Sequence, residues 1–235
     1  MVSGERLLLI AAEAREFSGL WKYCRKVRKL DWPVHLAKAA ELNGREVVMA
    51  ANGAGAVRAA QAVAVAGSFE QPGFICSMGF CGALDNEMRV GAVFVAERVQ
   101  TGGGEYPALR PQSGRRHCTG VLASIDHVAQ TAEEKRELRV RGAAAVDMEA
   151  AGVAAKAAEL KVPFYCIKSV TDLAGENFHL DLNAALRPDG RFDTMRIITA
   201  SCRRPLSTLP ELLRLGRRAH MASQTLGEFV ADCRF

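Results

Sequence analysis

The sequence lacks the patterns of a metal-binding, disulfide-bonded or membrane-spanning protein. Its seven cysteines form no CxxC pair and no cluster with histidine at zinc-finger spacing. An odd number of cysteines without a pairing pattern is typical of a reducing compartment, so free thiols and a cytoplasmic location are expected. No run approaches the roughly 20 apolar residues of a membrane-spanning helix. The apolar run near the N-terminus is too short for a signal peptide and reads as a first strand.

Aromatic residues are scarce, and neither sign of charge dominates strongly. Phe, Trp and Tyr make up 6% of the 235 residues, and the formal net charge is +5. No basic run is interleaved with aromatic side chains, so a nucleic-acid-binding surface is not expected. Isolated histidines such as His117, His127 and His179 are more often surface or core residues than ligands. We therefore predict neither a metal site nor a cofactor.

Linkers, repeats and low-complexity segments are also missing, which predicts a single domain over residues 1–235. Strand-like and helix-like segments alternate, which indicates an α/β fold with a mixed, mostly parallel sheet flanked by helices. Asn43-Gly44 predicts a β-hairpin between residues 35–42 and 45–52. The other strands are expected at 7–12, 74–78, 92–96, 117–123, 143–146 and 162–170. Helices are expected at 14–28, 56–69, 131–141 and 147–160 and from 192 onward with a break near Pro205, and a long surface loop at 102–111.

Two acidic residues, Glu149 and Asp172, follow predicted strands. They are separated by one predicted helix, which is the spacing of a strand-helix-strand unit. Ligands of such sheets bind beyond the carboxyl ends of the strands, so we expect both carboxylates at one edge of neighbouring strands. Paired carboxylates there suit a reaction that builds positive charge on a sugar and needs an acid on the leaving group.

Structural roles explain the same pattern. Asp147 is typical of a helix cap, Glu149 in a first helical turn complements the helix dipole, and Asp172 can end a strand in a turn. The glycines of Gly53-Ala54-Gly55 fit either an anion cradle or a tight strand-helix turn. Spacing alone leaves both interpretations open.

The two acidic residues belong to a segment that resembles the nucleoside phosphorylase superfamily, especially methylthioadenosine/S-adenosylhomocysteine nucleosidases. Residues 145–174 read AVDMEAAGVAAKAAELKVPFYCIKSVTDLA. In that family a strand precedes Met-Glu-Ala at a helix start, and Val-Pro-Phe enters a strand that ends in Ser-Asp. Weaker similarity in LNGREVVMAANGAGAVRAA and GFCGALDNEMRVGAVFVAE extends the match to about residues 6–186, the second containing the family's glycine turn. The resemblance implies the family's three-layer fold, cleavage of a purine nucleoside at its N-glycosidic bond, and a homodimer.

The resemblance also implies a role for each matching residue. Asp172 matches the acid that protonates or hydrogen-bonds purine N7, and burial is expected to raise its pKa. Glu149 matches the residue that binds the ribose hydroxyls and stabilises an oxocarbenium-like transition state. Glu16 matches the glutamate that orients the attacking water. Met148 matches the residue under the ribose, and pocket-lining positions are matched by Ala12, Gly82, Val128 and Thr171.

Three residues depart from the family pattern. Phe80 stands where the nucleosidases have serine, which is a phosphate ligand in the phosphorylases, although its backbone amide could still contribute. Lys168 replaces the usual arginine near the water and loses the bidentate fork. Thr171 replaces the serine before the acid and keeps a hydroxyl.

Phe80 together with Glu16 favours hydrolysis over phosphorolysis, because Arg58 and Lys168 are the only obvious phosphate contacts. Two alternatives stay open: a phosphate-dependent purine nucleoside phosphorylase, and a nucleoside-binding module that has lost catalysis. The presence of all three acidic residues favours an enzyme over a binder, since a binder needs no acid.

The C-terminal segment predicts a basic amphipathic helix from about residue 207. It combines leucines at helical spacing with arginines at positions 203, 204, 214, 217 and 218. A packed helix with a solvated basic face explains this pattern, and so does an interfacial helix on an anionic inner membrane surface. The segment resembles the hopanoid-associated branch of the superfamily, which implies an adenosyl-hopane lipid as substrate.

Overall fold

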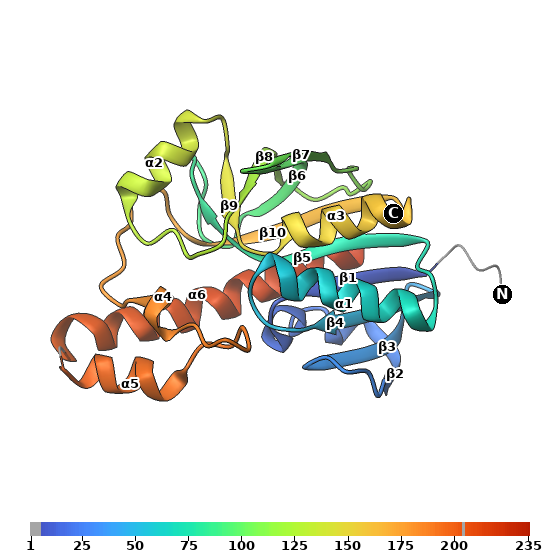
Figure 1. Ribbon diagram of the computed structural model, residues 1–235, viewed down its shortest axis with the longest axis horizontal. Coiled ribbons are helices and arrows are strands. Elements are labelled where there is room, and N and C mark those ends of the chain that lie inside the picture. The colour runs from blue at the N-terminus through green and yellow to red at the C-terminus, as the bar shows by residue number, and fades with distance from the viewer. Residues whose placement is uncertain (1–5, 204) are drawn as a thin grey trace.

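A mixed β-sheet forms the middle layer of the protein (Figure 1). The computed structural model describes residues 6–203 and 205–235, without the side chains of 194 and 200–207. Four strands run parallel at the centre of the sheet, namely β4 (Arg45–Ala51), β1 (Leu7–Ala11), β5 (Phe74–Ala83) and β10 (Phe164–Asp172). The antiparallel strands β3 (Leu36–Leu42) and β2 (Cys24–Lys29) extend the sheet beyond β4. The predicted α/β fold class with a mixed sheet is confirmed, as is the hairpin.

Strand β5 is the element that positions the site, because it changes partners along its length. Its first residues pair with β1, whereas Gly82 and Ala83 pair with the short antiparallel strand β9 (Ala145–Asp147). On its other side, β5 pairs with β10 up to Asp172. From β10 the pairing continues through β6 (Val93–Thr101) and β8 (Cys118–Ser124) to β9, so these five strands close into a ring. The remaining strand, β7 (Gly104–Pro107), pairs only with β6.

The predicted strand-helix-strand order is present as β9, α3 and β10, but the expectation that its two strands are neighbours is wrong. Strand β5 lies between β9 and β10, and β9 runs antiparallel to β5 while β10 runs parallel to it. Val146 of β9 and Asp172 of β10 are both paired with Gly82, so the strand ends still converge on one point of β5. The convergence therefore arises from the closed ring, which sequence spacing does not reveal.

Helices cover both faces of the sheet and give the predicted three layers. Helices α1 (Ala56–Phe69) and α3 (Ala150–Leu160) pack on one face through small residues. Their approach is so close that a Cβ on Gly152 would lie 1.8 Å from the Ala56 carbonyl oxygen. Helix α6 (Pro205–Asp232) covers the other face with Leu226, Phe229 and Val230. Helix α2 (Ala132–Val140) lies at the end of the sheet and is capped by the Thr131 side chain, as predicted.

A helical arm projects beyond the sheet in Figure 1. We use this name for α5 (Thr194–Arg203) and the first part of α6, residues 205–219, which pack against each other. The short helix α4 (Leu182–Ala185) precedes the arm. The arm confirms the predicted helices on either side of Pro205. No helix among the described residues is long and apolar enough to cross a membrane.

Three local predictions are wrong. Residues 14–28 form the short 3₁₀ helices η1 (Ala14–Phe17) and η2 (Trp21–Tyr23) followed by β2. Between the two helices, α6 passes so close that a Cβ on Gly19 would lie 2.1 Å from the Ser223 carbonyl oxygen. Residues 102–111 do not form one long loop, since β7 turns back on β6 directly after Thr101. The glycine segment 79–82, expected as a turn, lies inside β5.

The close contact of Gly227 with Gly19 predicts that a glycine-to-alanine substitution changes stability in opposite directions at two positions of α6, Gly227 and Gly216. A Cβ on Gly227 would lie 2.1 Å from the Gly19 carbonyl carbon, so Gly227→Ala should lower the free energy of unfolding by about 1–3 kcal/mol. Gly216, in the same helix, has no atom within 4 Å of such a Cβ. Gly216→Ala should therefore raise stability by about 0.5–1 kcal/mol. Thermal unfolding of both variants tests this, and equal melting temperatures would contradict the close contact.

Candidate active site

One cavity of about 500 Å³ opens where β1, β5, β9 and β10 end. Four buried acidic side chains line it, those of Glu16, Asp147, Glu149 and Asp172. Of the ten residues proposed from the sequence, nine line this cavity: Ala12, Glu16, Phe80, Gly82, Val128, Met148, Glu149, Thr171 and Asp172. The tenth, Lys168, is buried behind the cavity wall.

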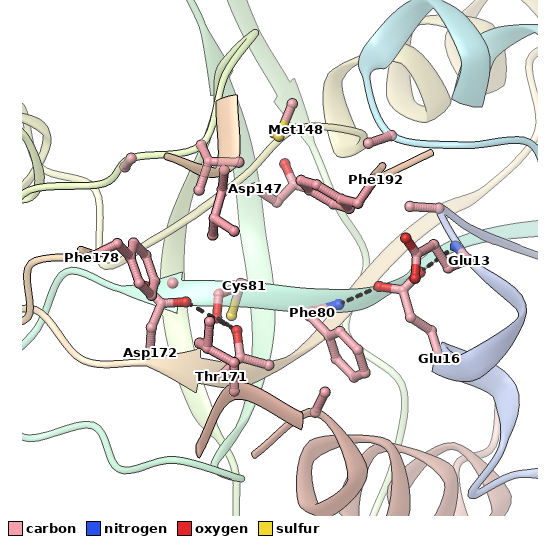
Figure 2. Close-up of a pocket in the computed structure, with 18 of the residues that line it drawn as sticks. Glu13, Glu16, Phe80, Cys81, Asp147, Met148, Thr171, Asp172, Phe178 and Phe192 are labelled. Carbon is pink, nitrogen blue, oxygen red and sulfur yellow. Dashed lines mark hydrogen bonds between the residues drawn. The ribbon is translucent and has the colours of Figure 1, made fainter. Parts of the chain in front are cut away.

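Asp172 occupies the last position of β10 beside Gly82 of β5. A Cβ on Gly82 would lie 2.8 Å from Asp172 Oδ2, so only glycine leaves room for this carboxyl group. The Thr171 hydroxyl donates to Asp172 Oδ1 over 3.0 Å, as Figure 2 shows. Burial raises the pKa of Asp172 above its usual value, while Lys135 and Thr171 oppose that rise.

Lys135 of α2 is a buried charged residue of the site that sequence reasoning missed. Its side chain is fully buried and its ammonium group lies 2.5 Å from Asp172 Oδ2. The same group donates to the Leu173 carbonyl oxygen over 2.9 Å and lies 5.3 Å from the centre of the Phe178 ring. The available signal was the i, i+3 spacing of Ala132, Lys135 and Leu138, which places lysine on the inward face of a charged helix.

Glu16 is held on the other side of the cavity by backbone amides. Its two carboxylate oxygens accept hydrogen bonds from Glu13 N over 2.8 Å and from Phe80 N over 2.9 Å (Figure 2). A Cβ on Gly79 would lie 2.6 Å from Glu16 Oε1, and this glycine has a φ of 151°, so a side chain is excluded there. Burial raises the pKa of Glu16, although these hydrogen bonds and Lys168 oppose the rise.

Glu149 lies at the start of α3, where its Oε1 accepts from Gly55 N over 3.0 Å. Burial, reinforced by the nearby Asp147, raises the pKa of Glu149 to about 8. The glycine turn at 53–55 therefore donates a backbone amide to a carboxyl group of the protein. This contact matters for the two interpretations of the turn, an anion cradle or a tight strand-helix turn, because the Gly55 amide is already bound to Glu149.

Asp147 combines the predicted helix cap with a buried ion pair. Its Oδ2 accepts from Ala150 N over 2.9 Å and lies 2.7 Å from Lys168 Nζ. Burial alone would lower the pKa of Lys168, but Asp147 and Glu149 raise it above the usual value. Lys168 is therefore a buried cation beneath the acidic groups and not a cavity-lining ligand.

The two ends of the cavity differ in chemistry. Figure 2 shows Asp172 with Phe178 at one end and Glu16 with Glu13 at the other, and Phe80 and Cys81 of β5 lie between them. The helical arm closes the cavity with apolar side chains from both of its helices. These are Ile197, Ile198, Leu212, Leu215 and Ala219, together with Phe192 just before α5.

The raised pKa of Glu149 predicts that the protein loses stability as the pH rises. Between its ordinary value of 4.5 and about 8, the unfolded chain has lost a proton that the folded protein retains. Each pH unit in this window lowers the free energy of unfolding by up to about 1.4 kcal/mol. Glu149→Gln removes the titrating group, so its melting temperature should exceed that of the wild type by a margin that grows from pH 5 to pH 8.

Glu159→Gln is the matched control, because this side chain lies on the same helix and is 61% exposed. Its melting temperature should differ from that of the wild type by an amount that does not grow over the same range. A constant gap for Glu149→Gln would show that the carboxyl group titrates normally.

Comparison with known proteins identifies the family. A model of the phosphorylase superfamily matches residues 25–118 and 110–190. The 5′-methylthioadenosine/S-adenosylhomocysteine nucleosidase of Colwellia psychrerythraea is 28% identical over 172 residues, which cover 58% of this chain and 70% of that protein.

Solved structures share the fold at lower identity. A nucleosidase from the same organism, in complex with adenine, superposes with a TM-score of 0.66 at 20% identity and 96% coverage of both chains. The futalosine hydrolase of Helicobacter pylori superposes with a TM-score of 0.70 at 15% identity, with 97% of this chain and 96% of that chain covered. The sequence resemblance to the superfamily is thereby confirmed, and the chain belongs to the phosphorylase superfamily.

Proposed function

We propose that the protein hydrolyses the N-glycosidic bond of a purine nucleoside, with adenine as the leaving base. The observation that carries this proposal is one cavity that collects Glu16, Glu149 and Asp172, all buried and all with raised pKa values. The names of the relatives agree, since they are nucleosidases of adenine-containing nucleosides.

In this mechanism the purine lies at the Asp172 end, beside the Phe178 ring. Protonated Asp172 donates its proton to purine N7 while the C1′–N9 bond breaks, and the bonding electrons leave with the base. Glu149 binds the ribose hydroxyls, and its ionised form stabilises the positive charge that develops on the sugar, with Met148 packed under the ring. A water molecule oriented by Glu16 attacks C1′ and gives its proton to that carboxylate. Ala12, Gly82, Val128 and Thr171 complete the walls.

The geometry favours water over phosphate as the nucleophile. The Phe80 side chain replaces a hydroxyl ligand, and its backbone amide already donates to Glu16. Lys168 is paired with Asp147, and the Arg58 guanidinium donates to the Pro188 carbonyl oxygen. Arg15 lines the cavity but is 57% exposed and paired with Glu13. These contacts leave no evident cluster of cations among the described residues for an anionic co-substrate.

The helical arm supports a more specific substrate. Its apolar side chains line the cavity next to the site, which fits a large apolar 5′ substituent such as that of adenosyl-hopane. Met195 and Leu213 of the arm are 68% and 58% exposed, and Leu213 is followed by the exposed Arg214 and Arg217. Exposed apolar side chains next to arginines suit contact with an anionic membrane surface. Arg204 and the Arg203 side chain lie outside the described residues.

We further propose that the protein acts as one domain in the cytoplasm, without a cofactor, and as a homodimer that contacts the inner membrane surface through the arm.

A base-release assay tests the nucleophile and the substrate. We expect adenine to be released from adenosyl-hopane in detergent at the same rate with and without phosphate. Release that requires phosphate would identify a phosphorylase, and binding without release would identify a nucleoside-binding module. Cleavage of methylthioadenosine but not of adenosyl-hopane would exclude the lipid substrate.

Co-sedimentation with anionic but not neutral vesicles is the expected sign of membrane contact, and its absence would exclude that contact.

Asp172→Asn should lower turnover by about 100-fold or more, because asparagine cannot supply the proton. Asp232→Asn, which changes an exposed carboxylate on the far end of α6, should leave turnover unchanged. Base release is measured for both variants under saturating substrate. Near-normal turnover of Asp172→Asn would remove its assignment as the acid.

A further inference from the structure

We propose that Lys135 is a positioning residue that makes Asp172 an effective acid by stabilising the carboxylate left after proton transfer. This inference deepens the proposed function and rests on it. It starts from a geometric observation: the fully buried ammonium group of Lys135 lies 2.5 Å from Asp172 Oδ2, on a carboxyl group that lines the cavity.

Lys135 is fixed by more than its acidic partner. Its ammonium group also donates to the Leu173 carbonyl oxygen over 2.9 Å, and the Phe178 ring lies 5.3 Å away. These contacts hold the cation on the Oδ2 side of Asp172, whereas Oδ1 accepts from the Thr171 hydroxyl within the cavity. Oδ2 of Asp172 therefore contacts the lysine, and Oδ1 is the oxygen that carries the transferred proton.

Among the charged groups around Asp172, Lys135 is the cation in direct contact with its carboxyl group. Glu176 follows in the next turn and opposes ionisation of Asp172. Arg218 of α6 also acts on Asp172, but its guanidinium is bound to Glu176 by hydrogen bonds of 2.6 and 2.8 Å. Cys81 of β5 is buried nearby and carries a raised pKa through burial. Lys135 therefore supplies the counter-charge that is not already committed to another acid.

The consequence for the reaction follows from the charge balance. In the proposed mechanism, Asp172 carries the proton before transfer and lies beside the Lys135 ammonium group. When the proton moves from Oδ1 to purine N7 and the base leaves with the C1′–N9 electrons, the new carboxylate forms a buried ion pair with Lys135. The pair stabilises the transition state more than the ground state, because the negative charge exists only as the proton departs.

Lys135→Met tests the inference while keeping the volume of the side chain. Loss of the cation should raise the pKa of Asp172, because an opposite charge at this distance lowers a carboxyl pKa by about 1–3 units. The alkaline limb of the pH profile for kcat/KM should therefore move to higher pH, while kcat for purine release falls about tenfold or more. Lys135→Arg should keep the limb near its wild-type position.

A second substrate separates this role from structural damage. A nitrophenyl riboside needs no proton on its leaving group, so its hydrolysis by Lys135→Met should fall less than about threefold. Lys156→Met removes a partly exposed lysine of α3 and should change neither substrate's rate. The double variant Lys135→Met/Asp172→Asn, which leaves no buried charge unpaired, should be no slower than Asp172→Asn alone.

Equal losses with both substrates and an unmoved alkaline limb would overturn the role of Lys135. So would a further loss of turnover in the double variant. In either case, a loss of turnover in the Asp172→Asn variant would still support the proposed function. If Asp172→Asn retained normal turnover, the proposed function would fail, and the role of Lys135 would fail with it.

Discussion

The site depends on keeping four acidic side chains buried around one cavity. Two buried lysines make this possible, Lys135 against Asp172 and Lys168 against Asp147. Lys135 comes from α2 and Lys168 from β10, so each of the two buried aspartates has its own counter-charge. Glu149 and Glu16 are instead held by backbone amides, and burial keeps their pKa values high. The result is a set of carboxyl groups that differ in their readiness to give or accept a proton.

The backbone of strand β5 makes this arrangement possible. Gly79 leaves room for Glu16 and Gly82 leaves room for Asp172, three positions apart on one strand. A side chain at either glycine would occupy the place of a carboxyl group. The closed ring of strands then brings β9 and β10 to the two sides of Gly82. The acidic residues therefore meet because of sheet order, and the glycines allow them to meet at close range.

The sequence predicts local elements better than their arrangement. The hairpin around Asn43-Gly44 and the helix at 56–69 follow directly from turn chemistry and composition, and both are confirmed. The order of β9, β5 and β10 depends on long-range pairing, which leaves no pattern in a three-residue strand. Family motifs located nine residues on one cavity, but Lys135 lies outside those motifs in a helix rich in charge. Only its spacing from Ala132 and Leu138 distinguishes it from a surface lysine.

The helical arm connects substrate access to the acid through two contacts of α6 with the segment after β10. Glu211 accepts from the amides of His179 and Leu180, and Arg218 binds Glu176, whose carboxylate also accepts from Leu173 N over 3.0 Å. Leu173 in turn offers its carbonyl oxygen to Lys135. The helix whose apolar side chains help to close the cavity is thus bound to the residue next to Asp172. Any movement of the arm that admits a large apolar group must either preserve these contacts or shift the turn that orients the acid.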